Sequence, residues 1–293
     1  MKNNNKKYLV TGGAGFVGSN LCRKLIQNSD STIYSLDNYS TGNKNNHISG
    51  IYYIEGETAD VQNLIKFQPD VIFHLGEYSR VEQSFEDINK VIFYNISGTS
   101  AILEFARNNK SKLIYAGSST KFSHGNDKNL VSPYSWTKAA NTELVKKYGE
   151  WFGLDYAITY FYNVYGMNEI SEGKYATLIE IFKKQMQKKQ PLTVVKPGTQ
   201  ERNFTHVDDI VSGLILVGEK GKGDGYGIGS QETYTINEVA KLFGGPLTYL
   251  EHRKGNRSGA DLLIDKTIKL GWKQKFYLED YINELKKNNW DKI

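Results

Sequence analysis

The sequence is organised around a glycine cluster near its start, Gly12-x-x-Gly15-x-x-Gly18. The apolar run at residues 8–10 predicts a buried strand before the cluster, and the apolar spacing from residue 19 predicts a helix after it. In such a turn the first glycine permits a sharp bend and the second lets the main chain approach a pyrophosphate. The third glycine lets the helix pack closely on the strand. The helix N-terminus then offers free N–H groups and the positive end of the helix dipole to phosphate oxygens.

An acidic residue follows the next predicted strand. Residues 32–36 have the composition of a strand, and Asp37 comes directly after them. A carboxylate at this place accepts hydrogen bonds from both ribose hydroxyls of NAD and repels the 2′-phosphate of NADP. A glycine triplet alone also occurs in ordinary strand-to-helix turns. The strand, the helix and the acid together favour an NAD-binding unit.

The first half of the chain alternates strands and helices. Strands are predicted at residues 51–54, 70–75, 112–116 and 155–161, and helices at 61–67, 89–108 and 132–152. This rhythm predicts an α/β fold with a Rossmann-type, doubly wound parallel sheet that binds ligands at the carboxyl ends of its strands.

The pattern changes after residue 166. Helices are predicted at residues 175–188, 207–218, 236–243 and from about 278, with a strand at 192–195 and a glycine-rich turn region at 221–229. We therefore predict an NAD-binding domain over residues 1–165 and a smaller substrate-binding lobe over residues 166–293. The two lobes are expected to interleave as one functional unit.

Composition narrows the class of protein. The 293 residues carry a net charge of only +5, and their lysines are scattered, so nucleic-acid binding is not expected. A mild positive field suits an anionic substrate such as a diphosphate. The single cysteine, Cys22, excludes an intrachain disulfide and fits a reducing compartment. No signal peptide or membrane span is apparent, and the histidines lack metal-ligand spacing, so we expect a cytoplasmic protein without a metal.

A tyrosine and a lysine share one face of the helix predicted from residue 132. Tyr134 and Lys138 are four residues apart, and a strand ending at Ser118 precedes their helix. The phenol of tyrosine ordinarily titrates near pH ~10, but a neighbouring ammonium and a positive nicotinamide ring favour the phenolate. Tyr134 could then act as a general base, with Ser118 orienting the reacting hydroxyl and Lys138 bonding the nicotinamide ribose. The alternative is a surface Tyr–Lys pair without a function.

With these motifs the sequence resembles the extended short-chain dehydrogenase/reductases, in the branch of nucleotide-sugar epimerases and dehydratases, over essentially its whole length. The matching stretches are residues 11–18, Asp37-Asn38, His74-Leu75, Asn95 with Gly98-Thr99, Ser118, Tyr134-x-x-x-Lys138, Asn163-Val164-Tyr165-Gly166, Arg202-Asn203-Phe204 with His206-Val207-Asp208-Asp209, and Leu270-Gly271-Trp272.

The resemblance implies that the first lobe binds NAD and the second binds a nucleotide diphosphate-sugar. The implied cofactor-binding residues are Gly12, Gly15, Phe16, Val17, Asp37, Asn38, Glu57, Thr58, Leu75, Gly76, Asn95 and Lys138. The implied substrate-binding residues are Ser119, Thr120, Asn163, Arg202 and Arg253. Arginine forks suit diphosphate oxygens, although Arg202 could instead form a surface ion pair with a neighbouring acid.

The sequence departs from this family pattern at several places. Dehydratases of the family carry an Asp-Glu pair after the catalytic Ser/Thr, whereas this chain has Ser119 and Thr120, which argues against water elimination. Gly76 and Glu77 stand where the family often has two alanines, and Lys121 stands where epimerases usually have an aliphatic residue. Glu77 and Lys121 could both face the site, and they leave the sugar and the fate of the keto intermediate open.

The sequence thus predicts an NAD-dependent enzyme that oxidises C4 of a nucleotide diphosphate-sugar as a 4-epimerase, in the synthesis of glycan precursors. One alternative is a 4-dehydrogenase that releases the keto sugar, for example from a GDP-heptose. Another is a catalytically silent NAD-binding regulator on the same fold. The helix from residue 132 has two partly apolar faces, one of them running from Trp136 to Trp151, which predicts a homodimer.

Overall fold

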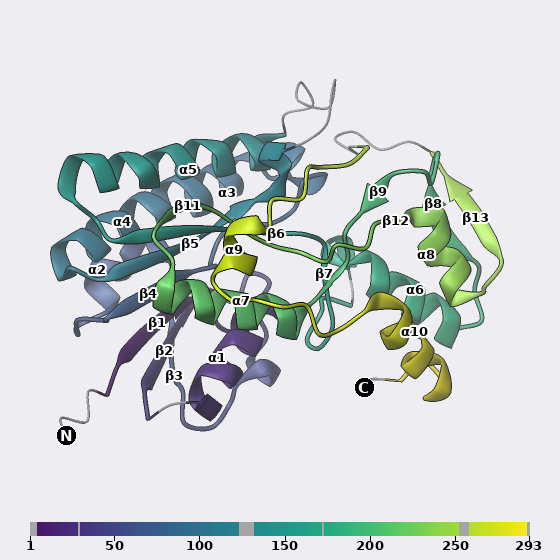
Figure 1. The fold of residues 1–293 in the computed structure, drawn as a ribbon, viewed down its shortest axis with the longest axis horizontal. Helices are drawn as coiled ribbons and strands as arrows, with labels where there is room; N and C mark the ends of the chain where they lie inside the picture. Colours follow the sequence, from purple (N-terminus) through teal and green to yellow (C-terminus); the bar gives the residue numbers. More distant parts are fainter. Residues whose placement is uncertain (1–4, 29, 123–131, 172, 252–257, 292–293) are drawn as a thin grey trace.

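A sheet of seven parallel strands forms the centre of the computed structural model, which describes residues 5–28, 30–122, 132–171, 173–251 and 258–291 (Figure 1). The strand order is β11-β6-β5-β4-β1-β2-β3. These strands are β1 (Lys7–Thr11), β2 (Thr32–Asp37), β3 (Tyr52–Glu55), β4 (Val71–His74), β5 (Lys112–Ser118), β6 (Tyr156–Phe161) and β11 (Gly223–Ile228). The predicted Rossmann-type, doubly wound sheet is confirmed.

Helices cover both faces of this sheet (Figure 1). One face carries α2 (Val61–Leu64), α3 (Ile88–Val91), α4 (Gly98–Asn109) and α5 (Pro133–Phe152), and the other carries α1 (Phe16–Asn28) and α7 (Val207–Lys220). A π-helical segment, Ile92–Ser97, joins α3 to α4, and α9 (Asp265–Lys269) lies beside β11. Short 3-10 turns occur at Lys44–Asn46, Thr58–Asp60, Gln83–Phe85, Ser119–Phe122 and Gly173–Tyr175.

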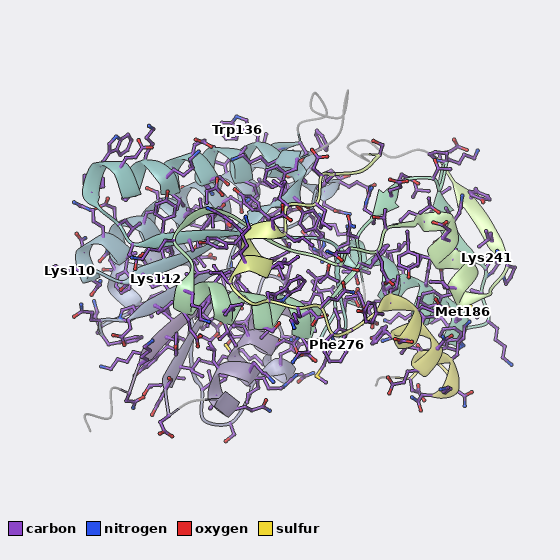
Figure 2. All side chains as sticks on the ribbon, viewed as in Figure 1. Lys110, Lys112, Trp136, Met186, Lys241 and Phe276 are labelled. Atoms are coloured by element: carbon purple, nitrogen blue, oxygen red, sulfur yellow. The ribbon has the colours of Figure 1, made fainter. Side chains whose placement is uncertain are left out.

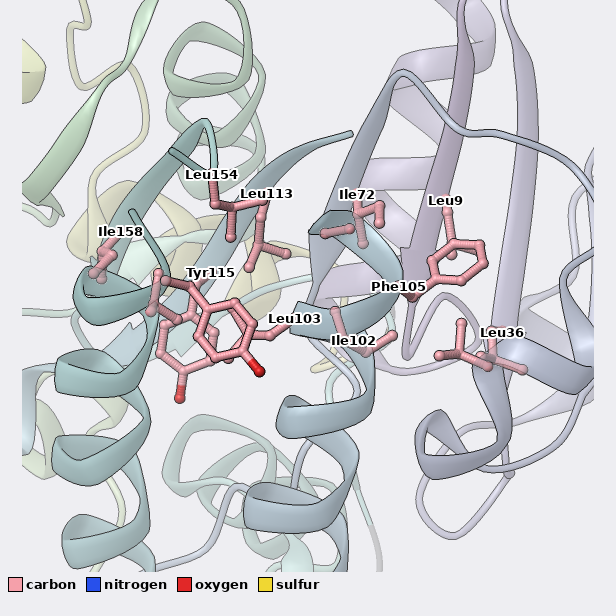
Figure 3. Close-up of a cluster of buried hydrophobic side chains, with 14 of the residues drawn as sticks. Leu9, Leu36, Ile72, Ile102, Leu103, Phe105, Leu113, Tyr115, Leu154 and Ile158 are labelled. Carbon is pink, nitrogen blue, oxygen red and sulfur yellow. The ribbon is translucent and has the colours of Figure 1, made fainter. Parts of the chain in front are cut away.

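Strand alternation divides the core between the two faces. Successive side chains of a strand point to opposite sides, so Leu9 packs with α4 and α5 while Val10 packs with α1 and α7. Figure 3 shows the first of these clusters, in which Leu9, Ile72 and Leu113 from three neighbouring strands meet helix side chains such as Leu103. All of these residues are buried.

The remaining elements form a smaller lobe beside the sheet (Figure 1). It contains α6 (Leu178–Gln187), α8 (Ile236–Phe243) and α10 (Leu278–Lys287), with β8 (Leu192–Val195) paired in parallel to β13 (Leu247–Leu250). Two short pairs join it to the sheet region, β7 (Val164–Tyr165) with β10 (Thr205–His206), and β9 (Glu201–Arg202) with β12 (Tyr234–Thr235). None of the helices described is long and apolar enough to cross a membrane. The domain division at residue 165 stays a prediction.

The glycine-rich region at residues 221–229 was expected to be a turn, and this expectation is wrong. It forms β11, which pairs in parallel with β6 at the edge of the central sheet and has a register shift between Gly223 and Tyr226. Gly227 serves a close approach, because a Cβ on it would lie 2.1 Å from the carbonyl oxygen of Leu263, whereas Gly223 and Gly225 have φ of +76° and +100°. The predicted helix at residues 61–67 also ends earlier, at Leu64, and the strand β13 was not predicted.

Candidate active site

The carboxyl ends of β1 and β4 touch through glycines. Gly12 has a φ of +71°, and a Cβ on it would lie 2.9 Å from the Cα of Gly76. A Cβ on Gly18 would lie 2.0 Å from the carbonyl oxygen of Gly12. Glycine is therefore required at both positions, and the main chain between β1 and α1 stays open to a ligand.

The end of β2 places an acid beside this glycine loop. Asp37 accepts hydrogen bonds from the main-chain N–H groups of Ala14 at 2.9 Å and Tyr39 at 2.8 Å. Burial raises the pKa of Asp37, although these N–H donors favour the charged form. Asn38 donates to the Glu57 carboxylate at 2.8 Å, so two further candidate residues lie together.

A pocket of about 480 Å³ runs from this loop towards the smaller lobe. Ser118, at the end of β5, lines it together with Tyr134 and Lys138 from the first turns of α5. Of the other candidates, the structure brings the following to the same pocket: Gly12, Gly15, Phe16, Val17, Asp37, Asn38, Glu57, Thr58, Leu75, Gly76, Ser119, Thr120 and Asn163. Their individual roles stay predictions.

The start of α5 is fixed by local sequence. Ser132 is the N-cap, its side chain accepts from the N–H of Ser135, and Ser135 in turn caps Ser132, which completes a capping box. Pro133 occupies the first helical position, where its missing N–H costs nothing. The cap therefore sets the rotation of the helix that presents Tyr134 and Lys138 to the pocket.

Lys138 is paired with a buried carboxylate. Its Nζ donates to Oε2 of Glu77 and, at 2.6 Å, to the carbonyl oxygen of Ala116. The side chains of Glu77 and Lys138 are 1% and 7% exposed. Glu77 also lines the pocket, so this residue faces the site, a question that the sequence alone did not decide. Lys121, also left open, instead pairs at 3.4 Å with Glu143 on the surface.

Two candidates among the described residues, Asn95 and Arg202, do not line the pocket. Asn95 is buried, and its side chain binds the main chain of Tyr78 and, at 2.9 Å, the hydroxyl of Thr137. Arg202 donates to the carbonyl oxygens of Glu201 at 2.7 Å and Ser258 at 3.3 Å. Arg253 lies outside the described residues.

Two residues that line the pocket, the basic Arg80 and the acidic Glu169, were not predicted from the sequence. Arg80 donates through Nε and Nη2 to the carbonyl oxygen of Tyr175, at 3.0 and 2.7 Å. Burial lowers the pKa of Arg80, and attraction to Tyr134 opposes this effect. Glu169 is buried and accepts from the N–H of Gly166 at 3.0 Å. Arg80 lies in the loop that follows β4, six residues after His74, and its place beyond the carboxyl end of a strand was a signal that could have been used.

The comparisons with known proteins show the family to which the chain belongs. The family model that matches residues 8–229 is that of the NAD-dependent epimerase/dehydratase family. The chain belongs to this family. As a member it is an NAD-dependent enzyme, which confirms the predicted cofactor and enzyme class.

Similar proteins of the family act on nucleotide sugars by name. A protein of Methanocaldococcus jannaschii, provisionally named UDP-glucose 4-epimerase, is 31% identical over 96% of this chain and 99% of its own length. UDP-glucuronic acid decarboxylase 6 of Arabidopsis thaliana is 31% identical over 81% of this chain and 73% of its own length. The UDP-glucose 4-epimerase of Thermotoga maritima, solved with UDP-glucose, is 26% identical with a TM-score of 0.88, covering 96% of this chain and 99% of its own.

Glu169 makes the stability of the protein depend on pH. Burial raises its pKa from 4.5 to about 8, so its contribution to stability is present below pH 4.5 and is lost as the pH rises through 8. We expect Glu169→Gln to remove this loss. The free energy of unfolding of the variant minus that of wild type should be roughly 2 kcal/mol higher at alkaline than at mildly acidic pH.

Denaturant unfolding at several pH values measures this difference. Glu86→Gln is the matched control, because Glu86 is exposed and its substitution should leave the pH dependence unchanged. Parallel pH curves for wild type and Glu169→Gln would show that Glu169 is already ionised in the folded protein.

Proposed function

We propose that this protein is a nucleotide-sugar 4-epimerase, in which NAD serves as a hydride acceptor and then as a hydride donor. The observation that carries the proposal is the meeting of Ser118, Tyr134 and Lys138 with the glycine loop in one pocket. Tyr134 would take the proton of the C4 hydroxyl, Ser118 would orient that hydroxyl, and Lys138 would favour the phenolate. Tyr134 would later return the proton to the opposite epimer.

The residues around the glycine loop fit NAD. The bare main chain at Gly12, Gly15 and Gly76 allows close approach of a pyrophosphate, and the N-terminus of α1 directs its N–H groups there. Asp37 stands at the end of β2, where a carboxylate accepts the ribose hydroxyls and disfavours a 2′-phosphate. An ordinary glycine-rich turn would not require an acid beside it. Here the carboxylate of Asp37 accepts a hydrogen bond from the loop, at the N–H of Ala14.

A nucleotide diphosphate-sugar fits the other end of the pocket. Asn163 and Phe204 line that end, and Arg80 supplies a cation with no carboxylate at ion-pair distance among the described residues. Arg202 and Arg253 remain proposed diphosphate contacts, because guanidinium groups suit phosphate oxygens. The named substrates of the similar proteins, such as UDP-glucose, are of this class.

Epimerisation is preferred to the other reactions of the family. Ser119 and Thr120 stand where the family's dehydratases have their acid and base, so a group that could expel water is missing from these positions. The similar proteins include several named as 4-epimerases. The product would then be an activated sugar for glycan synthesis. A 4-dehydrogenase and a silent NAD-binding regulator are the other outcomes that the following experiment distinguishes.

The experiment incubates the purified protein with NAD and a panel of UDP-, GDP- and dTDP-sugars and identifies the products by chromatography and mass spectrometry. We expect the 4-epimer of at least one sugar, without net NADH. Tyr134→Phe should lower kcat by about a hundredfold to ten-thousandfold, because it removes the proton acceptor and keeps the ring. Its thermal midpoint and its affinity for NAD should stay near those of wild type.

A 4-keto sugar with one NADH per turnover would identify a dehydrogenase instead. NAD binding without turnover of any sugar would identify a regulator. Normal turnover by Tyr134→Phe would contradict the proposed role of Tyr134 whatever the product.

We also propose that the protein is a homodimer through the outer face of α5. Trp136 and Trp151 on this helix are 53% and 60% exposed, and Figure 2 shows Trp136 projecting away from the body of the molecule. Ile92 and Phe93, in the π-helical segment beside α5, are exposed as well. Large aromatic and aliphatic side chains on adjoining helices are typical of an interface between two copies.

Light scattering at micromolar concentration should give twice the mass of the chain, and Trp136→Glu with Trp151→Glu should give the mass of one. Lys24→Glu, at an exposed position of α1 on the opposite face of the sheet, is the control and should remain a dimer. A monomer mass for the wild type would refute the proposal.

A further inference from the structure

The loop after β4 carries a carboxylate that is bound on every side. Glu77 Oε2 accepts from Lys138 Nζ, and Oε1 accepts from Asn141 Nδ2 at 2.9 Å, Thr99 Oγ1 at 3.0 Å and Tyr115 OH at 3.2 Å. A buried carboxylate held by this many donors has little freedom to move.

A directed chain of hydrogen bonds leads from the glycine loop to this carboxylate. Thr11 Oγ1 accepts the N–H groups of Leu75 and Gly76, so its own hydrogen points to Nδ1 of His74 at 2.7 Å. The pKa of His74 is lowered to about 4 by burial, so the ring is neutral and carries its proton on Nε2. Nε2 then donates to Thr99 at 3.0 Å, and the Thr99 hydroxyl donates to Glu77.

The carboxylate of Glu77 forms an ion pair with Lys138, the lysine that the proposed mechanism uses. Two of the three N–H groups of Lys138 are directed to Glu77 and to the carbonyl of Ala116, and its ammonium lies 5.0 Å from the centre of the Tyr115 ring. An ammonium alone would favour the phenolate of Tyr134 strongly, whereas an ammonium paired with a carboxylate presents a much smaller net field.

We propose that Glu77 is a positioning residue of the reaction, which anchors the Lys138 ammonium and offsets its charge so that Tyr134 keeps its proton to a higher pH. This inference rests on the proposed function, since it gives Glu77 a task in the same acid–base step. The proposal also gives a reason for the acid beside Lys138. An unpaired lysine would favour the phenolate of Tyr134 most strongly, and Glu77 moderates that effect.

The other ionisable groups around Glu77 and Lys138 keep the same charge in all the variants compared below. Among the described residues, His74 is neutral, and burial keeps the phenol of Tyr115 protonated by raising its pKa. Arg80 stays positive and interacts with Tyr134 across the pocket, but it is the same in every variant compared below. The difference between variants therefore reports the charge of Glu77.

The first test needs no substrate. Tyrosinate absorbance in the ultraviolet is titrated for wild type and Glu77→Gln, each beside its own Tyr134→Phe counterpart, so that the difference isolates Tyr134. We expect the ionisation midpoint of Tyr134 to fall by about one pH unit in Glu77→Gln, because the ammonium is no longer offset. Thr99→Val removes one hydrogen bond to Glu77 but no charge, and it should leave the midpoint within experimental error.

Two further variants keep the test valid if Glu77→Gln does not fold. Glu77→Ala leaves Lys138 its contact with Ala116 and should also lower the midpoint. Lys138→Met should raise it. An unchanged or higher midpoint in both Glu77 variants would overturn the proposal, as would an equal shift in Thr99→Val, which would assign a structural role to the hydrogen bonds.

The second test uses a sugar that the wild type turns over. The acidic limb of the kcat–pH profile should move to lower pH in Glu77→Gln by the same amount as the absorbance midpoint, while KM for the sugar changes little. A shifted absorbance midpoint with no turnover of any sugar would leave the role of Glu77 standing and refute the proposed function. A shifted KM with an unmoved profile would refute the role of Glu77.

Discussion

The parallel pairing of β1 with both β2 and β4 is the constraint on which the site depends. Because all three strands run in the same direction, their carboxyl ends meet at one edge, where the glycine loop, Asp37 and Gly76 come together. The contact between Gly12 and Gly76 leaves no room for a Cβ on either residue. Their small size is therefore a condition for the loop conformation and for the space that a dinucleotide would need.

The same edge also holds the polar groups that set the electrostatics of the pocket. Thr11 at the end of β1 binds His74 at the end of β4, and the chain continues through Thr99 to Glu77 and Lys138. Each buried donor in this chain has an acceptor, which is why the groups can lie in the interior without a large desolvation cost. The glycine loop and α5 are thus joined by one continuous network.

Local sequence was sufficient for the parts of the site that depend on spacing. The glycine triplet, Asp37 after the second strand, and the helical separation of Tyr134 from Lys138 each follow from the periodicity of one or two elements. The structure brings all of these residues to the same pocket. The order of the first strands and helices could be read from their apolar patterns for the same reason.

Features that depend on distant contacts could not be read in this way. The glycines in β11 suggested a turn, yet this segment forms a strand because it pairs with β6. Gly227 must lack a side chain because the main chain of Leu263 packs directly against it. The partner of Glu77 lies 61 residues further along the chain, so its sequence neighbourhood says nothing of the ion pair. Arg80 likewise gains its place in the pocket from Tyr175 in the smaller lobe.

The central claim is that hydride leaves C4 of a nucleotide sugar and returns to the same carbon within one binding event. A sugar that the protein turns over, labelled with deuterium at C4, tests this most directly when the product is analysed by mass spectrometry and NMR. The account predicts that the 4-epimer retains its deuterium at C4 and that no reduced NAD accumulates. Exchange of the label with solvent, or its appearance in released NADH together with a keto sugar, would contradict it.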